Sequence, residues 1–166
     1  KPMEAAPLMQ AVREAVGEEM PVHFHTHSTS SGSLATCMEM ARCGCNIIDT
    51  CTAAMADGTS QPSMNSFVAM MEGAPNDTGI KFMDLEAYDM YWGAIRNTYS
   101  PFESGMKSGT ARVFEHQIPG GKYSNLLVQS KSLNLDTPEK WSAVLDAYRD
   151  VNQLFGDVVK VTPSSK

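Results

Sequence analysis

The sequence contains no continuous apolar run long enough to cross a bilayer, although 42% of its 166 residues are hydrophobic. Its opening stretch, KPMEAAPLMQ, has neither the apolar segment nor the small-residue cleavage site of a signal peptide. Both absences argue against a membrane or secreted protein. We therefore expect a soluble chain that has no membrane partner.

Runs of like charge are also missing. The chain has 13 Lys and Arg residues against 19 Asp and Glu residues, for a formal net charge of −6. A protein that grips a phosphate backbone needs a cluster of basic side chains. The sequence therefore predicts no nucleic-acid partner.

Cysteine is sparse, and all four cysteines fall within residues 37–51. They include no C-x-x-C pair of the kind that holds zinc. We interpret them as small buried thiols in a reducing compartment, with a disulfide or a thiolate metal site as the alternative.

Hydrophobic periodicity predicts an alternation of helices and strands in the first third of the chain. Residues 3–16 and 32–44 have apolar side chains at helical spacing, with Leu8 and Val16 on the apolar face of the first helix. Residues 20–27 alternate with period two, and residues 45–51 form a short apolar run of strand length. Helix, strand, helix, strand with short connections is typical of a parallel α/β sheet or barrel.

Helical patterns dominate the rest of the chain. We expect helices over residues 60–73, with Ser60 as the N-cap, and over residues 84–99 and 138–155. The IPGG sequence at residues 118–121 predicts a bend that opens into another helix. Because two strands cannot bury both faces of a parallel sheet, we also expect the chain to be part of a longer one.

Three histidines alternate along the first predicted strand, in the sequence PVHFHTHSTSSG at residues 21–32. His25 and His27 project from one face with their origins about 7 Å apart, a separation from which two imidazoles can bind one ion. The carboxyl end of a barrel strand is also where such folds place their chemistry. Two ligands are too few for a divalent cation, so histidines that only hydrogen-bond at a polar barrel mouth remain the alternative.

Four blocks of sequence resemble one known family. They are PVHFHTHSTSSG, the pair NIIDTC and MADGTSQPSMNSFVAMMEG, then KSGTARVFEHQIPGGKYSNL, and finally FGDVVKVTPSSK. In order and spacing they resemble the carboxyltransferase domain of pyruvate carboxylases. The oxaloacetate decarboxylase α subunit and the transcarboxylase 5S subunit are relatives with a similar barrel. The wider group of metal-dependent barrels includes hydroxymethylglutaryl-CoA lyase and isopropylmalate synthase.

The resemblance implies the C-terminal portion of a (β/α)8 TIM-type barrel followed by a helical funnel extension. Residues 1–60 would form the last two βα units of the barrel, and residues 61–166 the helical extension of the same domain. The aspartate and the carbamylated lysine that complete the family's metal site would lie before Lys1. We therefore expect the chain by itself to be inactive.

The resemblance also implies the site residues and cofactors. His25 and His27 would bind a divalent metal, either Zn, Mn or Mg. Thr162 would relay a proton between pyruvate and biotin, and Ser165 and Lys166 would line the pocket for a biotin that another domain carries. Judged from the residues alone, VTPSSK is an ordinary helix start with Thr162 as the cap, and the two interpretations are compatible.

The implied reaction is transfer of a carboxyl group from carboxybiotin to pyruvate, which gives oxaloacetate. The implied partners are the biotin-carrier and biotin carboxylase domains of a homotetramer, in the bacterial cytoplasm or the mitochondrial matrix. A decarboxylase or transcarboxylase, a biotin-free metal-barrel lyase and a non-enzymatic binding module that retains the barrel remain alternatives. The funnel segment VTPSSK favours the biotin-dependent carboxyltransferase, because this segment has no role in the biotin-free members of the wider group.

Three residues near the predicted metal site either depart from the family pattern or have no ligand role in it. Ser28 stands where the family usually has Asp, which would alter hydrogen bonding around the metal site. His23 has no ligand role, and we expect it deeper in the barrel. Asp49 could be catalytic, but a carboxylate at the end of a barrel strand more often orients its neighbours.

Overall fold

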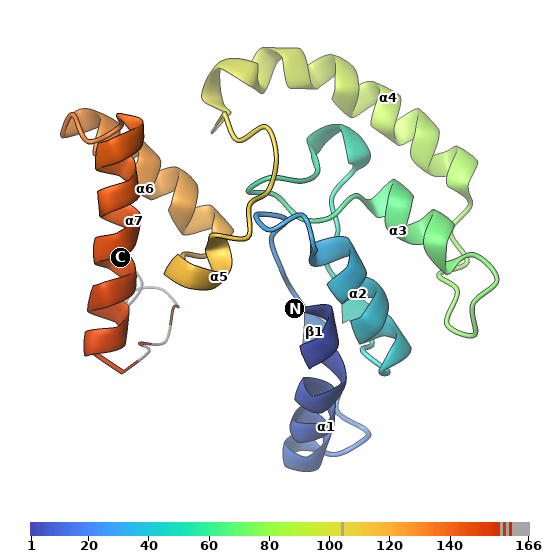
Figure 1. Ribbon diagram of the computed structural model, residues 1–166. Coiled ribbons are helices and arrows are strands. Elements are labelled where there is room, and N and C mark those ends of the chain that lie inside the picture. Colours follow the sequence, from blue (N-terminus) through green and yellow to red (C-terminus); the bar gives the residue numbers. More distant parts are fainter. Residues whose placement is uncertain (104, 157, 159, 161–166) are drawn as a thin grey trace.

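The computed structural model describes residues 1–103, 105–156, 158 and 160. In this part of the chain two short strands, β1 (His23–Phe24) and β2 (Ile47–Ile48), pair in parallel. Helices make up most of the rest. Figure 1 shows α1, α2 and α3 near the strand pair, α4 arching over α3, and α5 to α7 as a second group beside them. The predicted α/β class is confirmed.

The first two predicted helices are present. A 3-10 turn (Pro2–Glu4) leads into α1 (Ala5–Val16), which ends at Gly17 with φ of +83°, and α2 is Ser33–Arg42. The predicted apolar face of α1 is wrong, because Leu8 and Val16 are 52% and 45% exposed. The helix is instead rotated so that its small side chain at Ala5 and its flexible one at Met9 pack on α2 and the strands.

The strands are shorter than their predicted ranges of 20–27 and 45–51. Their register pairs His23 with Ile47 and Phe24 with Ile48. A strand extends only as far as a neighbouring strand forms hydrogen bonds with it, and β1 and β2 pair over just two residues each. The predicted alternation still extends beyond the ladder, since Val22, Phe24 and Thr26 are partly buried while His23 and His25 are exposed.

The third helix, α3 (Met64–Met71), begins later than predicted. Its cap is Ser63, whose Oγ accepts a hydrogen bond from the Ser66 backbone N–H at 3.3 Å, and not Ser60. The preceding residues are fixed outside the helix, because the carbonyls of Ser60 and Pro62 accept from the backbone N–H groups of Ser28 and Cys51. One core cluster joins α2 to α3 through Cys37, Ala41, Phe67 and Met71.

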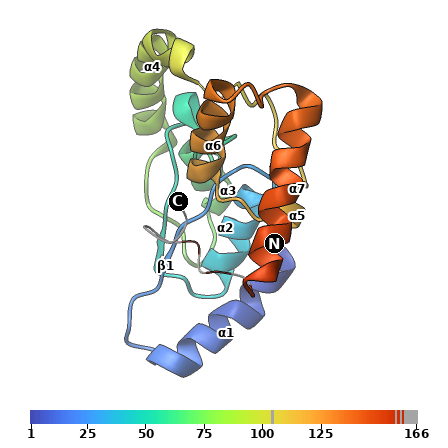
Figure 2. The same ribbon diagram turned by 90° about the vertical axis from the view of Figure 1, so that its left-hand side faces the viewer.

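The C-terminal half is helical, as predicted. Its elements are α4 (Phe82–Tyr99), the 3-10 turn Ser100–Phe102, α5 (Val113–His116), α6 (Gly120–Ser132) and α7 (Pro138–Leu154). A further 3-10 turn, Ala53–Met55, precedes α3 and contacts α4. Figures 1 and 2 show α6 and α7 running side by side. In the described residues no helix combines the length and apolarity needed to cross a membrane.

Apolar side chains recur at helical spacing along the last helix, which predicts a buried stripe through Trp141, Leu145, Val151 and Phe155, and the structure buries only half of it. Leu145 is buried, and the Trp141 indole N–H donates to the Tyr123 hydroxyl at 3.1 Å, which joins α7 to α6. Val151 and Phe155, further along the stripe, are 53% and 69% exposed. The stripe is buried where α5 and α6 lie against α7 and is exposed beyond them.

Candidate functional site

His25 and His27 follow β1 directly and converge. Their Nε2 atoms lie 3.3 Å apart, and their ring planes are inclined at 81°. The period-two spacing places both side chains on one face of the chain, and the structure brings the predicted pair together. Their role as metal ligands stays a prediction.

The opposite nitrogen of each imidazole is held by an acceptor from a different segment. The Nδ1 of His27 lies 2.7 Å from the Thr59 carbonyl oxygen, and the Nδ1 of His25 lies 2.7 Å from Asp49 Oδ2. A carbonyl and a carboxylate can only accept, so each Nδ1 carries the proton. In the neutral rings the two Nε2 lone pairs therefore face each other, and a positive charge between them would relieve their repulsion.

Asp49, just after β2, also binds the third histidine. Its Oδ1 accepts from His23 Nε2 at 2.7 Å, while Oδ2 accepts from His25. Hydrogen bonds from His23 and then His25 lower the pKa of the Asp49 carboxyl below its usual range. The His23 side chain is 51% exposed and reaches Asp49 from the first residue of β1. Its expected place deeper in the barrel stays a prediction.

The imidazole pair opens into a cleft of about 690 Å³. The cleft lies between the loop after β1 and the segment that joins α5 to α6, and its lining includes His25, His27, Phe114, Ile118 and Lys160. The Lys160 ammonium donates to Gln117 Oε1 at 2.8 Å. The predicted residues Thr162, Ser165 and Lys166 lie outside the described residues.

Gly120 lets the start of α6 lie directly on His27. A Cβ atom on this glycine would stand 2.6 Å from His27 Cβ and 2.7 Å from Cγ. The IPGG sequence was predicted to bend and open into a helix, and it does so with Pro119 as the cap residue. Gly120 is needed because a helix start approaches an imidazole closely at this point. The sequence alone does not reveal this contact.

A second contact seats the C-terminal half on the loop after β1. Gly109 N–H donates to Ser31 Oγ at 3.1 Å, and Thr110 N–H donates to the Thr29 carbonyl at 2.7 Å. A Cβ on Gly109 would stand 2.4 Å from the Ser31 nitrogen, so the two backbones touch. One wall of the histidine cleft is thereby fixed to the strand that carries the histidines.

Ser28, at the position where the family pattern has Asp, is 2% exposed. Its hydroxyl lies 2.5 Å from the Ser33 hydroxyl at the start of α2, and its backbone N–H donates to the Ser60 carbonyl. Ser28 therefore ties the loop after β1 to α2 and to the loop before α3.

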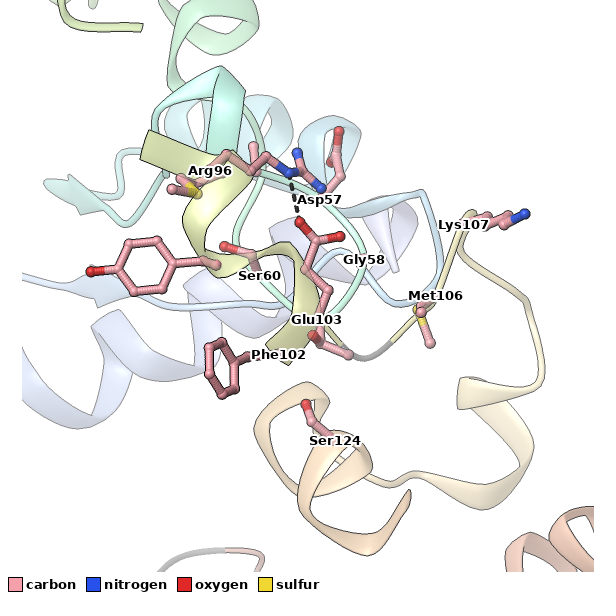
Figure 3. Close-up of a pocket in the computed structure, with 14 residues that line it drawn as sticks. Asp57, Gly58, Ser60, Arg96, Phe102, Glu103, Met106, Lys107 and Ser124 are labelled. Atoms are coloured by element: carbon pink, nitrogen blue, oxygen red, sulfur yellow. Dashed lines mark hydrogen bonds and ion pairs between the residues drawn. The ribbon is translucent and has the colours of Figure 1, made fainter. Parts of the chain in front are cut away.

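A second cleft, of about 350 Å³, lies on the other side of the 56–60 loop. Figure 3 shows Arg96 and Glu103 meeting over it, with the Arg96 Nε donating to Glu103 at 2.8 Å. Arg96 also donates to the Ala54 carbonyl at 2.7 Å, and its guanidinium lowers the pKa of the Glu103 carboxyl. Part of the lining lies in two of the sequence blocks that carry the family resemblance, but the pairing of Arg96 with Glu103 had no signal in the sequence.

Thr59 connects the two clefts. It lines the second cleft, and its carbonyl holds His27 in the first. Asp57 and Gly58 have positive φ angles of 68° and 57°, which shape the loop so that this carbonyl reaches the imidazole. A backbone acceptor has no residue signature, so sequence reasoning could not find it.

The sequence matches two family descriptions. Residues 1–90 match the HMGL-like family, and residues 113–166 match the conserved carboxylase domain. Pyruvate carboxylases of Staphylococcus aureus and Bacillus subtilis are 45% and 43% identical to it over 166 residues. The chain is covered completely in both comparisons but spans only 14% of each relative's length.

The fold also matches solved structures. The carboxyl transferase domain from Rhizobium etli pyruvate carboxylase, crystallised with pyruvate, superposes with a TM-score of 0.92 at 42% identity. The match covers 99% of this chain and 27% of that one. The resemblance inferred from the four sequence blocks is confirmed. With its family match over residues 1–90 of 166, the chain belongs to the HMGL-like family, and over its whole length it is similar to pyruvate carboxylase.

Proposed function

We propose that this chain is part of a biotin-dependent carboxyltransferase that moves a carboxyl group from carboxybiotin to pyruvate and so forms oxaloacetate. The observation that carries the proposal is the pair of imidazoles that lines a cleft together with Lys160. Lys160 stands two residues before Thr162 in the sequence. Related Rhizobium etli domains were crystallised with pyruvate and with oxamate and biotin, which supports the same substrates here.

The architecture proposed for this activity is the end of a TIM-type barrel with a helical funnel. Residues 1–60 would supply the last two βα units, and residues 61–166 the extension. The parallel β1–β2 pair with α2 between its strands supports the first assignment, because such crossovers build barrels. The remaining barrel, the biotin carboxylase and the biotin carrier would belong to the rest of a homotetrameric protein, in a bacterial cytoplasm or a mitochondrial matrix.

His25 and His27 would hold a divalent metal, either Zn, Mn or Mg. The donor set fits, because both Nε2 lone pairs face one point and both Nδ1 atoms are held by acceptors. In the described part of the chain no three His, Cys, Asp or Glu side chains form a group that could hold an ion, so the proposed site would need ligands besides these side chains. When bound, such an ion acts as a Lewis acid that draws electron density from the pyruvate carbonyl.

Thr162 would move the proton. Its hydroxyl can accept a proton from the methyl group of pyruvate while it donates its own to the ureido nitrogen of biotin, so no full charge settles on the oxygen. Cleavage of the N–C bond of carboxybiotin releases carbon dioxide and leaves the ureido nitrogen that takes this proton, and the pyruvate enolate attacks the released carbon dioxide to form oxaloacetate. Ser165 and Lys166 would hold the biotin ring, and the apolar side chains of Phe114 and Ile118 line the same cleft and limit access of water to the enolate.

The test is Thr162→Ala in the full-length protein. We expect pyruvate carboxylation to fall by about 10²- to 10⁴-fold, the usual contribution of a positioned proton donor and acceptor, with bound metal unchanged. Thr137→Ala is the matched control, since Thr137 caps α7 before a proline just as Thr162 precedes Pro163. If Thr162 is only a helix cap, both variants will lose about 1 kcal/mol of stability and keep their activity, which would refute the proposal.

A further inference from the structure

Asp49 joins the two exposed histidines of the first strand. Its two carboxylate oxygens each accept one imidazole N–H at 2.7 Å, from His23 and from His25. The main chain at this point is also fixed, because Asp49 N–H donates to the Phe24 carbonyl at 3.0 Å. The carboxylate therefore has a defined position relative to β1, although the side chain is 36% exposed.

His25 needs this support more than His27 does. The His25 side chain is 53% exposed, and Asp49 is the acceptor at its Nδ1. His27 is partly buried, lies against the start of α6 and is held by the Thr59 carbonyl. An exposed imidazole without an acceptor can rotate and exchange tautomers, and in one tautomer the proton sits on Nε2 and blocks ligation.

We propose that Asp49 is a positioning residue, which His23 holds in place, and that it keeps the Nε2 lone pair of His25 aimed at His27. His23 acquires a role by the same geometry, because its N–H occupies the second carboxylate oxygen and prevents Asp49 from turning away. This inference rests on the proposed function, in which the imidazole pair binds a metal. It assigns neither Asp49 nor His23 to the metal itself.

The expected effect is on metal affinity. Removing an acceptor behind a ligating histidine typically weakens metal binding by about 10- to 100-fold. Asp49→Ala should show this full loss. Asp49→Asn should lose less, because its amide oxygen can still accept from His25 although the negative charge is gone. His23→Ala should also lose less, since the carboxylate remains but one of its two donors is missing.

The experiment uses the full-length protein, stripped of metal with a chelator and titrated with Zn²⁺ against a coloured competitor. Visible spectra of the Co²⁺-loaded variants report the ligand geometry directly. Asp150→Asn is the matched control, because this exposed carboxylate on α7 pairs with its neighbour Arg149 and does not line the histidine cleft. Circular dichroism and melting curves show whether each variant folds, and Asp49→Asn carries the test if Asp49→Ala does not.

The two proposals fail in different ways. Zn²⁺ affinity and a Co²⁺ spectrum unchanged in every folded Asp49 variant would overturn the positioning role, whatever the activity. An affinity lowered in the predicted order, in a protein that does not carboxylate pyruvate, would support the positioning role and refute the carboxyltransferase. A wild-type protein that binds no Zn²⁺ or Co²⁺ would overturn both.

Discussion

The close contact between α6 and His27 makes a sharp prediction for Gly120→Ala. A new Cβ would stand 2.6 Å from His27 Cβ and 2.8 Å from Nδ1, whereas carbon atoms in contact normally lie about 3.5–4.0 Å apart. The gap to be opened is therefore about 1 Å. The nearest atoms cannot easily move, because Cβ is fixed to the β1 segment and Nδ1 is held by the Thr59 carbonyl.

Two opposing effects decide the result. Replacing Gly by Ala at a compatible position stabilises a protein by about 0.4–1 kcal/mol, because the unfolded chain loses freedom. Forcing an extra carbon into a filled contact costs about 1–3 kcal/mol. We expect the steric cost to win at Gly120, with a net destabilisation of about 1–2 kcal/mol. The shift of His27 should also lower metal affinity.

Gly121→Ala is the control from the next position of the same helix. A Cβ on Gly121 would meet no atom within 4 Å, so this variant should be unchanged or slightly more stable. Thermal melting and Zn²⁺ titration of the two full-length variants make the comparison. If Gly120→Ala matches Gly121→Ala in both measurements, α6 does not rest on His27 and the reasoning is wrong.

Two further predictions concern buried groups. Burial, and then the charge of Arg112, lower the pKa of His116, whose Nδ1 accepts from Ile118 N–H at 3.0 Å. As the pH falls, the unfolded chain therefore takes up the proton first, and the melting temperature should fall as the pH drops below the ordinary pKa of 6.5. His116→Asn should make the melting temperature less dependent on pH. The same pH dependence in the wild-type protein and the variant would contradict this prediction. Burial also raises the pKa of the Cys37 thiol to about 11. A thiol reagent at neutral pH should therefore label Cys37 last of the four cysteines, as followed by mass spectrometry. Early labelling of Cys37 would show that α2 is not packed as described.

Much of the fold follows from local patterns in the sequence. The helices α1, α2, α4, α6 and α7 were predicted, because spacing of apolar residues and capping residues act within one element. The order helix, strand, helix, strand predicted the parallel pairing, and the short helix α5 was not predicted. The errors concern tertiary neighbours. The apolar face of α1, the start of α3 and the exposed end of the α7 stripe depend on which segments pack there, and no single element encodes that.

The candidate site was predicted only in part. The H-x-H spacing was sufficient to bring two imidazoles together, because strand geometry alone controls it. Their orientation depends on Asp49 and on the Thr59 carbonyl, which lie 24 and 32 residues away along the chain. Gly120 contributes by having no side chain. Contacts of this kind become visible only once distant segments are folded against one another.

The central proposal is that His25 and His27 bind one metal and that the Thr162 hydroxyl acts in the same cleft. Anomalous X-ray scattering from crystals of the full-length protein loaded with Zn²⁺ tests it most directly. We predict one peak at about 2.0–2.1 Å from the Nε2 atoms of both histidines, with the Thr162 hydroxyl facing the same chamber. A peak elsewhere, or a Thr162 hydroxyl separated from the imidazoles by packed protein, would contradict the account.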